Sequence, residues 1–411
     1  MSKKVSIIGG GIIGLCSAYY LAKEGLEVTV FDKTDMTDGC SYGNAGMIVP
    51  SHVIPLAQPG MIAQGIKWMF NSQSPFYVKP RLSSDLLKWG WQFYKHANQK
   101  HVEKAMPALR DLSLLSKELY QEFARQDNSF FYEEKGLLML FKTDKVAAEM
   151  HHEGKLAEDL GLGVRYLSKE EVTKLETGTT TDVIGGVHYT SDAHLYPQKF
   201  MQFLKQELAE LGVNIYGNTE VKGFTIQNGL VTAVETNKGS FVTNEVVLAT
   251  GSWSPEIAKK LQENISLLPG KGYSFTLKNK KAKPNIPSIL CEGKVAVTPM
   301  ANDIRFGGTM EITHNQDTSI NINRVKGIVN TINYFYPDLQ IAMPKKEETW
   351  FGFRPCTPSG MPIIKKSQKL SNLTIAIGHA MMGLSLAPAT GKLVSELLLG
   401  KSTSVPTKMF Q

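Results

Sequence analysis

The feature that most constrains the fold is a glycine-rich turn between a short apolar strand and a helix at the start of the chain. Residues 5–8 have the pattern of a buried strand, and Gly-Gly-Gly-Ile-Ile-Gly at residues 9–14 follows directly. An apolar helical pattern comes next and ends at Gly25, and a second short strand at residues 28–31 stops at Asp32. Such a strand, glycine turn, helix and second strand with a terminal acid make up the dinucleotide-binding βαβ unit. The sequence therefore predicts an α/β fold that binds a dinucleotide.

The glycines of this unit have separate tasks. Gly9 makes the tight turn, Gly11 lets the backbone approach a pyrophosphate, and Gly14 lets the helix pack close to the strand. The helix N-terminus offers N–H groups to the phosphates, and the Asp32 carboxylate can accept hydrogen bonds from ribose hydroxyls. The fingerprint serves FAD and NAD alike. Its place at the extreme N-terminus favours FAD, with an NAD-linked oxidoreductase as the alternative.

Length and charge limit the remaining classes. A chain of 411 residues with 42% hydrophobic residues is too long for one compact core and suits two domains. The net charge of +7 comes from scattered Lys and Arg residues, so we expect no nucleic-acid partner. An acidic substrate or an anionic membrane surface would fit that charge.

The cysteines and the hydropathy bear on the compartment. The four cysteines are spaced neither as a metal knuckle nor as a redox pair, so we expect no metal site and a reducing environment. No apolar run is long enough to cross a bilayer. We expect a cytoplasmic protein, with peripheral attachment to the inner membrane as the variant to test. The cysteines are Cys16, Cys40, Cys291 and Cys356.

Hydrophobic periodicity predicts the other main elements. Amphipathic helices are expected over residues 108–126 and 198–211, and strands between residues 213 and 249 and again through 272–312. A last helix is expected from about Pro388 to Leu399, with Pro388 as an early helical residue.

Residues 55–105 are rich in Trp, Met and Phe, interspersed with lysines. A helix that covers the core is the favoured interpretation, because aromatic residues at helical spacing are more often buried. A membrane-surface or quinone-contacting helix is the alternative.

Short segments in a fixed order along nearly the whole chain carry a resemblance to a known family. They are the fingerprint at residues 9–14, Ser-Tyr-Gly-Asn-Ala-Gly at 41–46, Ala-Thr-Gly-Ser-Trp-Ser at 249–254, Lys-Gly-Tyr-Ser at 271–274, Phe-Gly-Gly-Thr-Met-Glu at 306–311, Gly-Phe-Arg-Pro-Cys-Thr-Pro at 352–358 and Gly-His-Ala-Met-Met-Gly-Leu at 378–384. In this ordered set the chain resembles the D-amino-acid oxidase superfamily of FAD enzymes. Within it, the chain is most similar to bacterial FAD-dependent D-amino-acid dehydrogenases.

The resemblance implies an interleaved architecture. An FAD-binding, Rossmann-like domain of the glutathione-reductase type would be assembled from residues 1–60, 160–262 and 350–411. An α+β substrate domain, built on a mostly antiparallel sheet, would come from residues 61–159 and 263–349.

The resemblance also assigns residues to the cofactor, which we expect to be non-covalent FAD. No cysteine falls clearly at the position that tethers FAD in related oxidases, and Cys356 is out of register. The start of the last helix would face the flavin pyrimidine and favour negative charge there. The expected cofactor contacts are Gly9, Gly11, Ile12, Ile13, Gly14, Asp32, Lys33, Cys40, Ser41, Asn44, Ala45, Gly46, Met47, Val221, Gly251, Gly378, His379, Met382, Gly383, Leu384 and Ser385.

Four residues are implied for the substrate. Arg354 would clamp a carboxylate bidentately, with a structural salt bridge as the alternative. Tyr273 would be a second partner of the carboxylate. His52 would line the pocket or be an ordinary loop histidine, and His379 would act through its position and backbone rather than as a base.

The implied activity is oxidation of a D-amino acid to the imine or 2-oxo acid, by hydride transfer to flavin N5. The implied partners are a small amino acid and a quinone-like electron acceptor. Within the family, a D-hydroxyproline or D-proline dehydrogenase is the first alternative. A glycine or sarcosine oxidase is disfavoured because Ala296 stands where such oxidases often carry tyrosine. The alternative of another class is an FAD-carrying electron-transfer subunit of a larger complex.

Overall fold

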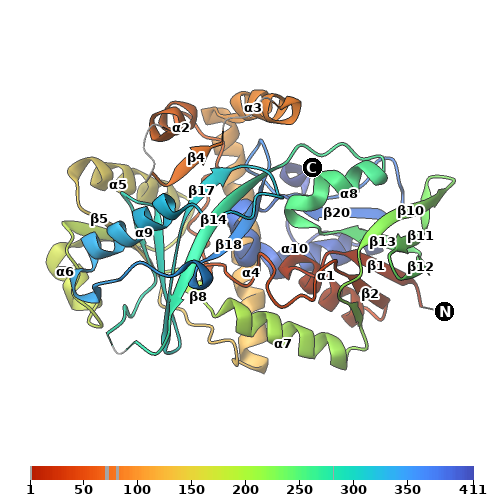
Figure 1. Ribbon diagram of the computed structural model, residues 1–411, viewed down its shortest axis with the longest axis horizontal. Helices are drawn as coiled ribbons and strands as arrows, with labels where there is room; N and C mark the ends of the chain where they lie inside the picture. The colour runs from red at the N-terminus through yellow and green to blue at the C-terminus, as the bar shows by residue number, and fades with distance from the viewer. Residues whose placement is uncertain (1, 70–73, 80–82, 281) are drawn as a thin grey trace.

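A computed structural model describes residues 2–69, 74–79, 83–280 and 282–411, and it holds two large sheets side by side (Figure 1). Within these residues the first sheet has six strands in the order β19-β20-β13-β1-β2-β9, all parallel except β19. This parallel sheet confirms the predicted α/β class. Its strands are β1 (Lys4–Ile8), β2 (Glu27–Phe31), β9 (Asn214–Tyr216), β13 (Glu245–Leu248), β19 (Ile363–Lys366) and β20 (Leu373–Ile377).

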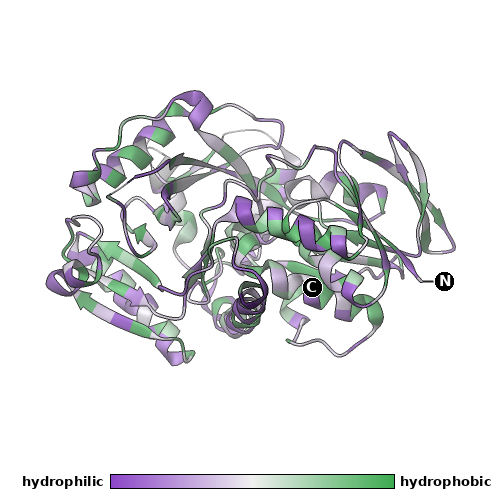
Figure 2. Ribbon diagram, turned by 90° about the horizontal axis from the view of Figure 1, so that it is seen from below, coloured by the Kyte–Doolittle hydropathy of each residue, from purple (hydrophilic) through white to green (hydrophobic). Residues whose placement is uncertain are grey.

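Helices that bury apolar faces cover the first sheet. α1 (Ile12–Lys23) packs on α7 (Pro197–Glu210) and α10 (Gly383–Leu399), and α10 also packs on the long α4 (Gln99–Gln126). Their buried side chains form one core cluster with residues of β1 and β2. Figure 2 shows hydrophobic and hydrophilic turns alternating along the outer helices, as expected for elements with one buried face.

The second sheet runs in the order β18-β14-β17-β16-β15-β5-β7-β6, with the short β4 paired to β17. It is antiparallel except where β15 meets β5 and β4 meets β17, as expected for the substrate domain. α9 (Ile322–Phe335) covers one face of it. The strands are β4 (Phe76–Val78), β5 (Leu137–Phe141), β6 (Val164–Ser168), β7 (Gly185–Tyr189), β14 (Leu268–Leu277), β15 (Ser288–Leu290), β16 (Val295–Met300), β17 (Asp303–Ile312) and β18 (Trp350–Cys356).

Smaller elements complete the described chain. They are the sheet of β10 (Val221–Gln227), β11 (Leu230–Thr236) and β12 (Gly239–Val242), the pair β3 (Met47–Ile48) and β8 (Ala193–His194), and the helices α2 (Met61–Met69), α3 (Ser84–His96), α5 (Asp144–Asp159), α6 (Lys169–Leu175) and α8 (Ser254–Lys260).

Sheet pairing corrects the expected domain boundaries. β6 and β7 lie within residues 160–262, yet they pair in the second sheet. β18, within residues 350–411, also pairs there, whereas α4, within 61–159, packs into the core of the first sheet. These assignments depend on pairing between distant segments, which local periodicity does not show.

The start of α10 differs from the prediction as well. The helix begins at Gly383, so Pro388 lies inside it. Proline has no N–H for the carbonyl four residues earlier, which is that of Leu384. The Tyr120 hydroxyl of α4 donates to this oxygen at 2.6 Å and satisfies it.

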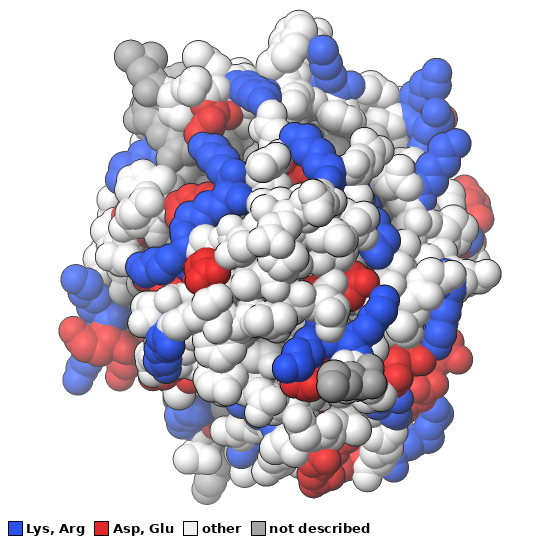
Figure 3. Space-filling view, turned by 90° about the vertical axis from the view of Figure 1, so that its right-hand side faces the viewer, with Lys and Arg blue, Asp and Glu red and all other residues white. Residues whose placement is uncertain are grey.

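The charge distribution on the surface and the hydropathy of the helices are relevant to nucleic-acid and membrane partners. On the face shown in Figure 3, Lys and Arg side chains are spread out and Asp and Glu side chains lie among them. None of the helices in the described residues has the length and apolar character needed to cross a membrane.

Candidate functional site

A cavity of about 1150 Å³ is lined by residues of both sheets. One end is formed by the glycine turn after β1 and by the end of β2. The other end is formed by β14, β16, β17 and β18 of the second sheet and by the start of α10. A concave site of this size, shared between two sheets, is where a ligand site is expected.

The glycine turn leaves room for a ligand where the motif requires it. Gly9 has φ +110°, and a Cβ on it would lie 2.4 Å from Ala249 O. A Cβ on Gly14 would lie 1.9 Å from Gly9 O, so only glycine allows this approach of α1 to β1. Gly11 caps α1 without a side-chain hydrogen bond, which leaves helical N–H groups available for phosphate oxygens.

Asp32 and Lys33, just after β2, line the part of the cavity beside the glycine turn. Asp32 accepts from Gly10 N at 2.8 Å and from Thr34 N at 2.8 Å, which fixes the carboxylate at the cavity wall. Oδ1 also accepts from Thr34 Oγ1 at 2.7 Å, so Oδ2 is the oxygen that keeps acceptor capacity for a ribose hydroxyl. The Lys33 ammonium lies 4.1 Å from the ring centroid of Trp253, a cavity residue that the sequence analysis missed.

The segment of residues 40–47 is held by a buried arginine. Arg305 of β17 donates to Tyr42 O at 2.8 Å and to Asn44 O at 2.9 Å. Ser41 Oγ accepts from Ile12 N at 3.0 Å and joins the segment to α1. Arg305 therefore positions a wall of the cavity, and no local sequence signal marks it for that role.

The N-terminal end of α10 lies at the cavity. Met382, Gly383 and Leu384 line it, and the helix has no side-chain cap. The ring of His379 is buried, and its Nε2 lies 2.9 Å from Thr390 Oγ1. Burial lowers the pKa of His379 to about 3, so the imidazole stays neutral.

Glycines form the cavity face of the second sheet near β18. A Cβ on Gly272 would lie 2.1 Å from Arg354 Nη1 and 2.4 Å from Nη2, so the guanidinium rests on the Gly272 backbone. Arg354 Nη1 donates to Thr309 O at 2.6 Å. Thr309 has φ +61° at a register shift between β14 and β17, which turns its carbonyl toward the arginine.

Arg354 has no carboxylate partner within the described residues, since none of their ion pairs includes it. Burial lowers its pKa, although a guanidinium still keeps its proton. A desolvated cation without a counter-ion is costly. A bound carboxylate would supply that charge, and the described residues hold no salt bridge of the kind considered as an alternative.

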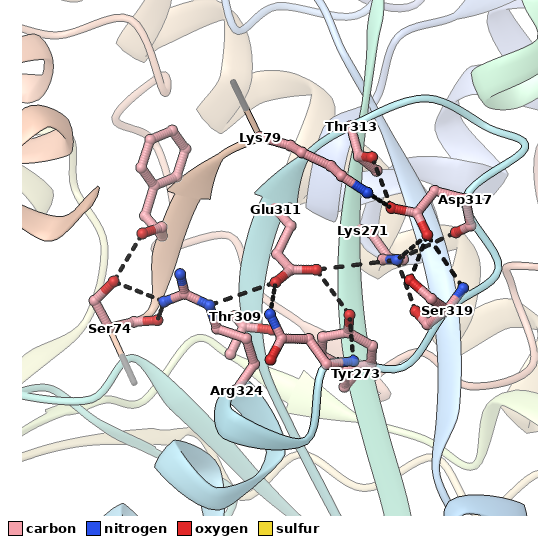
Figure 4. Close-up of polar contacts among 12 residues, drawn as sticks. Ser74, Lys79, Lys271, Tyr273, Thr309, Glu311, Thr313, Asp317, Ser319 and Arg324 are labelled. Carbon is pink, nitrogen blue, oxygen red and sulfur yellow. Dashed lines mark hydrogen bonds and ion pairs between the residues drawn. The ribbon is translucent and has the colours of Figure 1, made fainter. Parts of the chain in front are cut away.

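Tyr273 corrects an expectation. It lines the cavity, but its hydroxyl donates to Glu311 Oε2 at 2.7 Å and accepts from Asn321 N at 3.2 Å. Figure 4 shows this hydroxyl inside a network of ion pairs around Glu311 and Lys271. Because side chains alternate along a strand, Gly272 and Ser274 face the cavity and Tyr273 faces α9. The hydroxyl is therefore not placed to bind a second oxygen of the carboxylate.

His52 lines the cavity. Its Nδ1 lies 3.2 Å from Ser51 Oγ, which donates to Asp192 Oδ2 at 2.5 Å. Burial, and secondarily Lys294, lowers the pKa of His52 to about 4, so the imidazole is neutral. The hydrogen bond between Nδ1 and Ser51 Oγ orients this ring, and Asp192 in turn holds the serine hydroxyl.

The cavity brings most of the expected residues together. Gly14 and Gly46 lie behind the wall rather than on it, and Gly46 takes φ +78° where a Cβ would meet Leu195 O at 2.3 Å. The expected residues on the wall are Gly9, Gly11, Ile12, Ile13, Asp32, Lys33, Cys40, Ser41, Asn44, Ala45, Met47, His52, Val221, Gly251, Tyr273, Arg354, Gly378, His379, Met382, Gly383, Leu384 and Ser385.

The cavity fits FAD on its chemistry. It has a dinucleotide turn at one end, helix N–H groups at the other, and a long space between them. Cys356 is buried in a cluster with Trp89 and Met310 and does not itself line the cavity. Burial raises its pKa to about 12, which leaves it a poor nucleophile for a covalent link.

Fold and site together define a flavin-dependent oxidoreductase, and comparison with known proteins agrees. Residues 4–397 match the family described as FAD dependent oxidoreductase, and the chain belongs to it. The chain is 30% identical to a D-amino acid dehydrogenase of Helicobacter pylori, over 97% of this chain and 95% of that one.

Solved structures share the fold. A glycine oxidase from Bacillus cereus matches 98% of this chain and 96% of its own with TM-score 0.76 and 22% identity. An L-proline dehydrogenase from P. horikoshii matches 99% and 96% with TM-score 0.76 and 23% identity. The family match confirms the predicted family and cofactor, and the solved structures confirm the predicted fold class.

Proposed function

We propose that this chain is a dehydrogenase that oxidises a D-amino acid at its Cα–N bond. The observation that carries the proposal is Arg354, a desolvated cation on the cavity wall without a carboxylate partner in the described residues. An amino acid supplies the missing carboxylate. The D configuration is supported by relatives named D-amino acid dehydrogenase that are matched over nearly their whole length.

Arg354 holds the substrate rather than reacting with it. Its fork binds the carboxylate through two hydrogen bonds and limits how the Cα–H can point. The amine must be neutral when the Cα–H bond breaks, and desolvation beside a cation lowers its pKa. Bound FAD supplies the hydride acceptor. The imine is released as such or is hydrolysed by water to the 2-oxo acid and ammonia.

A glycine-oxidase activity has less support. Ala296 lines the cavity and offers no hydroxyl for a small substrate. The glycine oxidase among the solved structures shares the fold at 22% identity, which says nothing of substrate. D-Proline and D-hydroxyproline stay within the proposed class of substrates.

For the electron acceptor we propose a quinone reached by peripheral contact with a membrane. In the aromatic segment of residues 55–105 some side chains are buried and others are exposed. Trp89 and Phe93 of α3 are buried, in line with the interpretation that this helix covers the core. Other apolar side chains of α2 and α3 are exposed near lysines, and both helices lie at the top of Figure 1. Such a surface suits an anionic bilayer. The exposed side chains are Ile62, Ile66, Leu87, Trp91 and Tyr94.

The experiment is turnover by the purified yellow chain with a panel of D- and L-amino acids and an artificial dye. We expect dye reduction with D-amino acids only. No reduction by the chain alone, restored by a partner protein, would instead identify an electron-transfer subunit. Acid precipitation is expected to release the colour into the supernatant, because the FAD is proposed to be non-covalent.

A further inference from the structure

His52 and Arg354 lie at different places on the cavity wall. The guanidinium of Arg354 rests on Gly272 of β14, and Lys294, which acts electrostatically on His52, stands in the turn between β15 and β16. In the second sheet Ser274 of β14 pairs with Gly307 of β17, and Gly307 pairs with Ala296 of β16. Gly272 and Ala296 are therefore two strands and two residues apart, so their Cα atoms are separated by about 12 Å at the usual strand spacing and rise. His52 and Arg354 both line the cavity that these strands border.

Part of the cavity wall is apolar. Gly307, Ala296, Ile289 and Met382 line it and offer no side-chain hydrogen-bonding group. His52 is a polar side chain of the same cavity in which a substrate bound by Arg354 would lie.

The hydrogen bonds behind His52 determine which ring nitrogen carries the proton. Asp192 is fully buried and accepts from both Ser51 N, at 3.0 Å, and Ser51 Oγ. The single hydroxyl proton of Ser51 is thus used on the carboxylate, so His52 Nδ1 must be the donor to Ser51 Oγ. Nε2 then carries a lone pair. In the described part of the chain Nε2 has no hydrogen-bond partner, and it is not among the polar atoms sealed from solvent.

We infer that His52 Nε2 accepts a hydrogen bond from a hydroxyl on the substrate side chain, and that Ser51 and Asp192 are positioning residues that hold the required tautomer. The inference rests on the proposed function and narrows its substrate class to D-amino acids with a hydroxylated side chain. A neutral acceptor near Lys294 suits a hydroxyl better than an ammonium or guanidinium, because the lysine repels a cation.

The tautomer depends on an ionised Asp192. Burial raises the pKa of Asp192 to about 7, against the hydrogen bonds from Ser51. Above this pH His52 Nδ1 donates to Ser51 Oγ, and Ser51 Oγ donates to the ionised Asp192 carboxylate. An amide in place of the carboxylate can donate to Ser51 Oγ, which frees the serine proton for Nδ1 and turns Nε2 into a donor.

The experiment compares kcat/KM for matched pairs, D-serine with D-alanine and cis-4-hydroxy-D-proline with D-proline, at a pH above the pKa of Asp192. The FAD-loaded wild type is expected to prefer the hydroxylated member of at least one pair by about 10-fold or more, since an acceptor left unpaired in the site disfavours the other. His52→Phe is expected to bring this ratio close to one, because it lowers kcat/KM for the hydroxylated member more than for the other. Asp192→Asn should lower the ratio similarly, and Ser51→Ala partly.

Controls separate the outcomes. His101→Phe lies outside the cavity and should keep the wild-type ratio. If His52→Phe does not fold, His52→Gln, which keeps an acceptor at another reach, and Ser51→Ala carry the test. A wild type that prefers neither hydroxylated member, or a His52→Phe ratio equal to wild type, overturns the inference. A yellow wild type that oxidises no D-amino acid at all contradicts the proposed function instead.

Discussion

Arg324, which is buried, and Arg354, which is half-buried on the cavity wall, both lie beside the second sheet, and they differ in what balances their charge. Arg324 Nε lies 3.4 Å from Glu311 Oε1, and its Nη1 donates to Ser74 O and Oγ (Figure 4). Arg354 donates to one carbonyl, that of Thr309, and takes part in no ion pair of the described residues. The comparison distinguishes an arginine whose charge is balanced by a carboxylate of the protein, which stabilises the fold, from one whose charge is not balanced in this way and is available to a ligand.

The ion-pair cluster that holds Arg324 extends across β14 and the loop before α9. Lys271, with 1% of its side chain exposed, lies 3.1 Å from Asp317 Oδ1 and 4.0 Å from Glu311 Oε2. Asp317 also binds Lys79, just after β4, and Thr313. Each buried charge of this cluster therefore has a partner of opposite sign.

The largest effect is expected from Arg354→Ala. Removing one partner of a buried charge pair costs about 2–5 kcal/mol, so kcat/KM for a D-amino acid should fall by about two to three orders of magnitude. Thermal stability should change little, because the wild-type arginine has no ion pair to lose. Steady-state kinetics and thermal unfolding on the same FAD-loaded samples measure both; near-normal kinetics would refute the assignment.

Glu311→Ala is the matching substitution in the ion-pair cluster of Lys271, Glu311, Asp317 and Arg324. It leaves Lys271 and Arg324 without their shared carboxylate and should lower the free energy of unfolding by about 3–5 kcal/mol. The kcat/KM of the remaining folded enzyme should stay within a few-fold of wild type. Urea unfolding measures the loss, with Glu103→Ala on the exposed face of α4 as the control that should lose little. Equal losses in the two variants would mean that the cluster is not a stabilising unit.

Gly272→Ala tests the position of Arg354 without removing it. The added Cβ would overlap the guanidinium, and such overpacking costs about 1–3 kcal/mol. We expect KM to rise about 10-fold or more while FAD stays bound. Gly90→Ala in α3 is the matched control, because its Cβ meets nothing within 4 Å. An unchanged KM in Gly272→Ala would contradict the position of the Arg354 guanidinium against the Gly272 backbone.

The smallest effect concerns pH. Burial alone would raise the pKa of Asp317, but hydrogen bonds from Ser319, Lys79 and Lys271 outweigh it and hold this pKa well below its usual range. A carboxyl with a depressed pKa contributes stability above its unfolded pKa, which is lost as pH falls through the folded value. Between neutral pH and about pH 3 the wild type should therefore lose more stability than Asp317→Asn. Parallel unfolding curves for both proteins at each pH would exclude this contribution.

Much of the fold could be predicted from local patterns. The βαβ unit depends on glycine spacing and short-range periodicity, and the strand-rich stretch of residues 272–312 does so too. The membership of β18 in the second sheet depends on pairing with β14, about 80 residues earlier in the chain, which periodicity does not encode. The same limit explains the misplaced boundary at residue 160.

For the site, the sequence identified residue types better than side-chain directions. Arg354 was predicted from its Gly-Phe-Arg-Pro context, and it lies on the cavity wall. Tyr273 was taken for its partner because the two faces of β14 cannot be told apart without its register. Arg305 was missed because its role is to bind carbonyls of a loop about 260 residues away.

Binding of a carboxylate that cannot be oxidised tests the central claim most directly. Benzoate and the neutral benzamide would be titrated into FAD-loaded wild type and Arg354→Met, with the change in the visible flavin spectrum as the readout. The account predicts that wild type binds benzoate and that Arg354→Met binds it about 100-fold more weakly, by analogy with other buried charge pairs. Benzamide should bind the two proteins alike. Equal dissociation constants for benzoate in wild type and variant would contradict the claim that Arg354 is the carboxylate site.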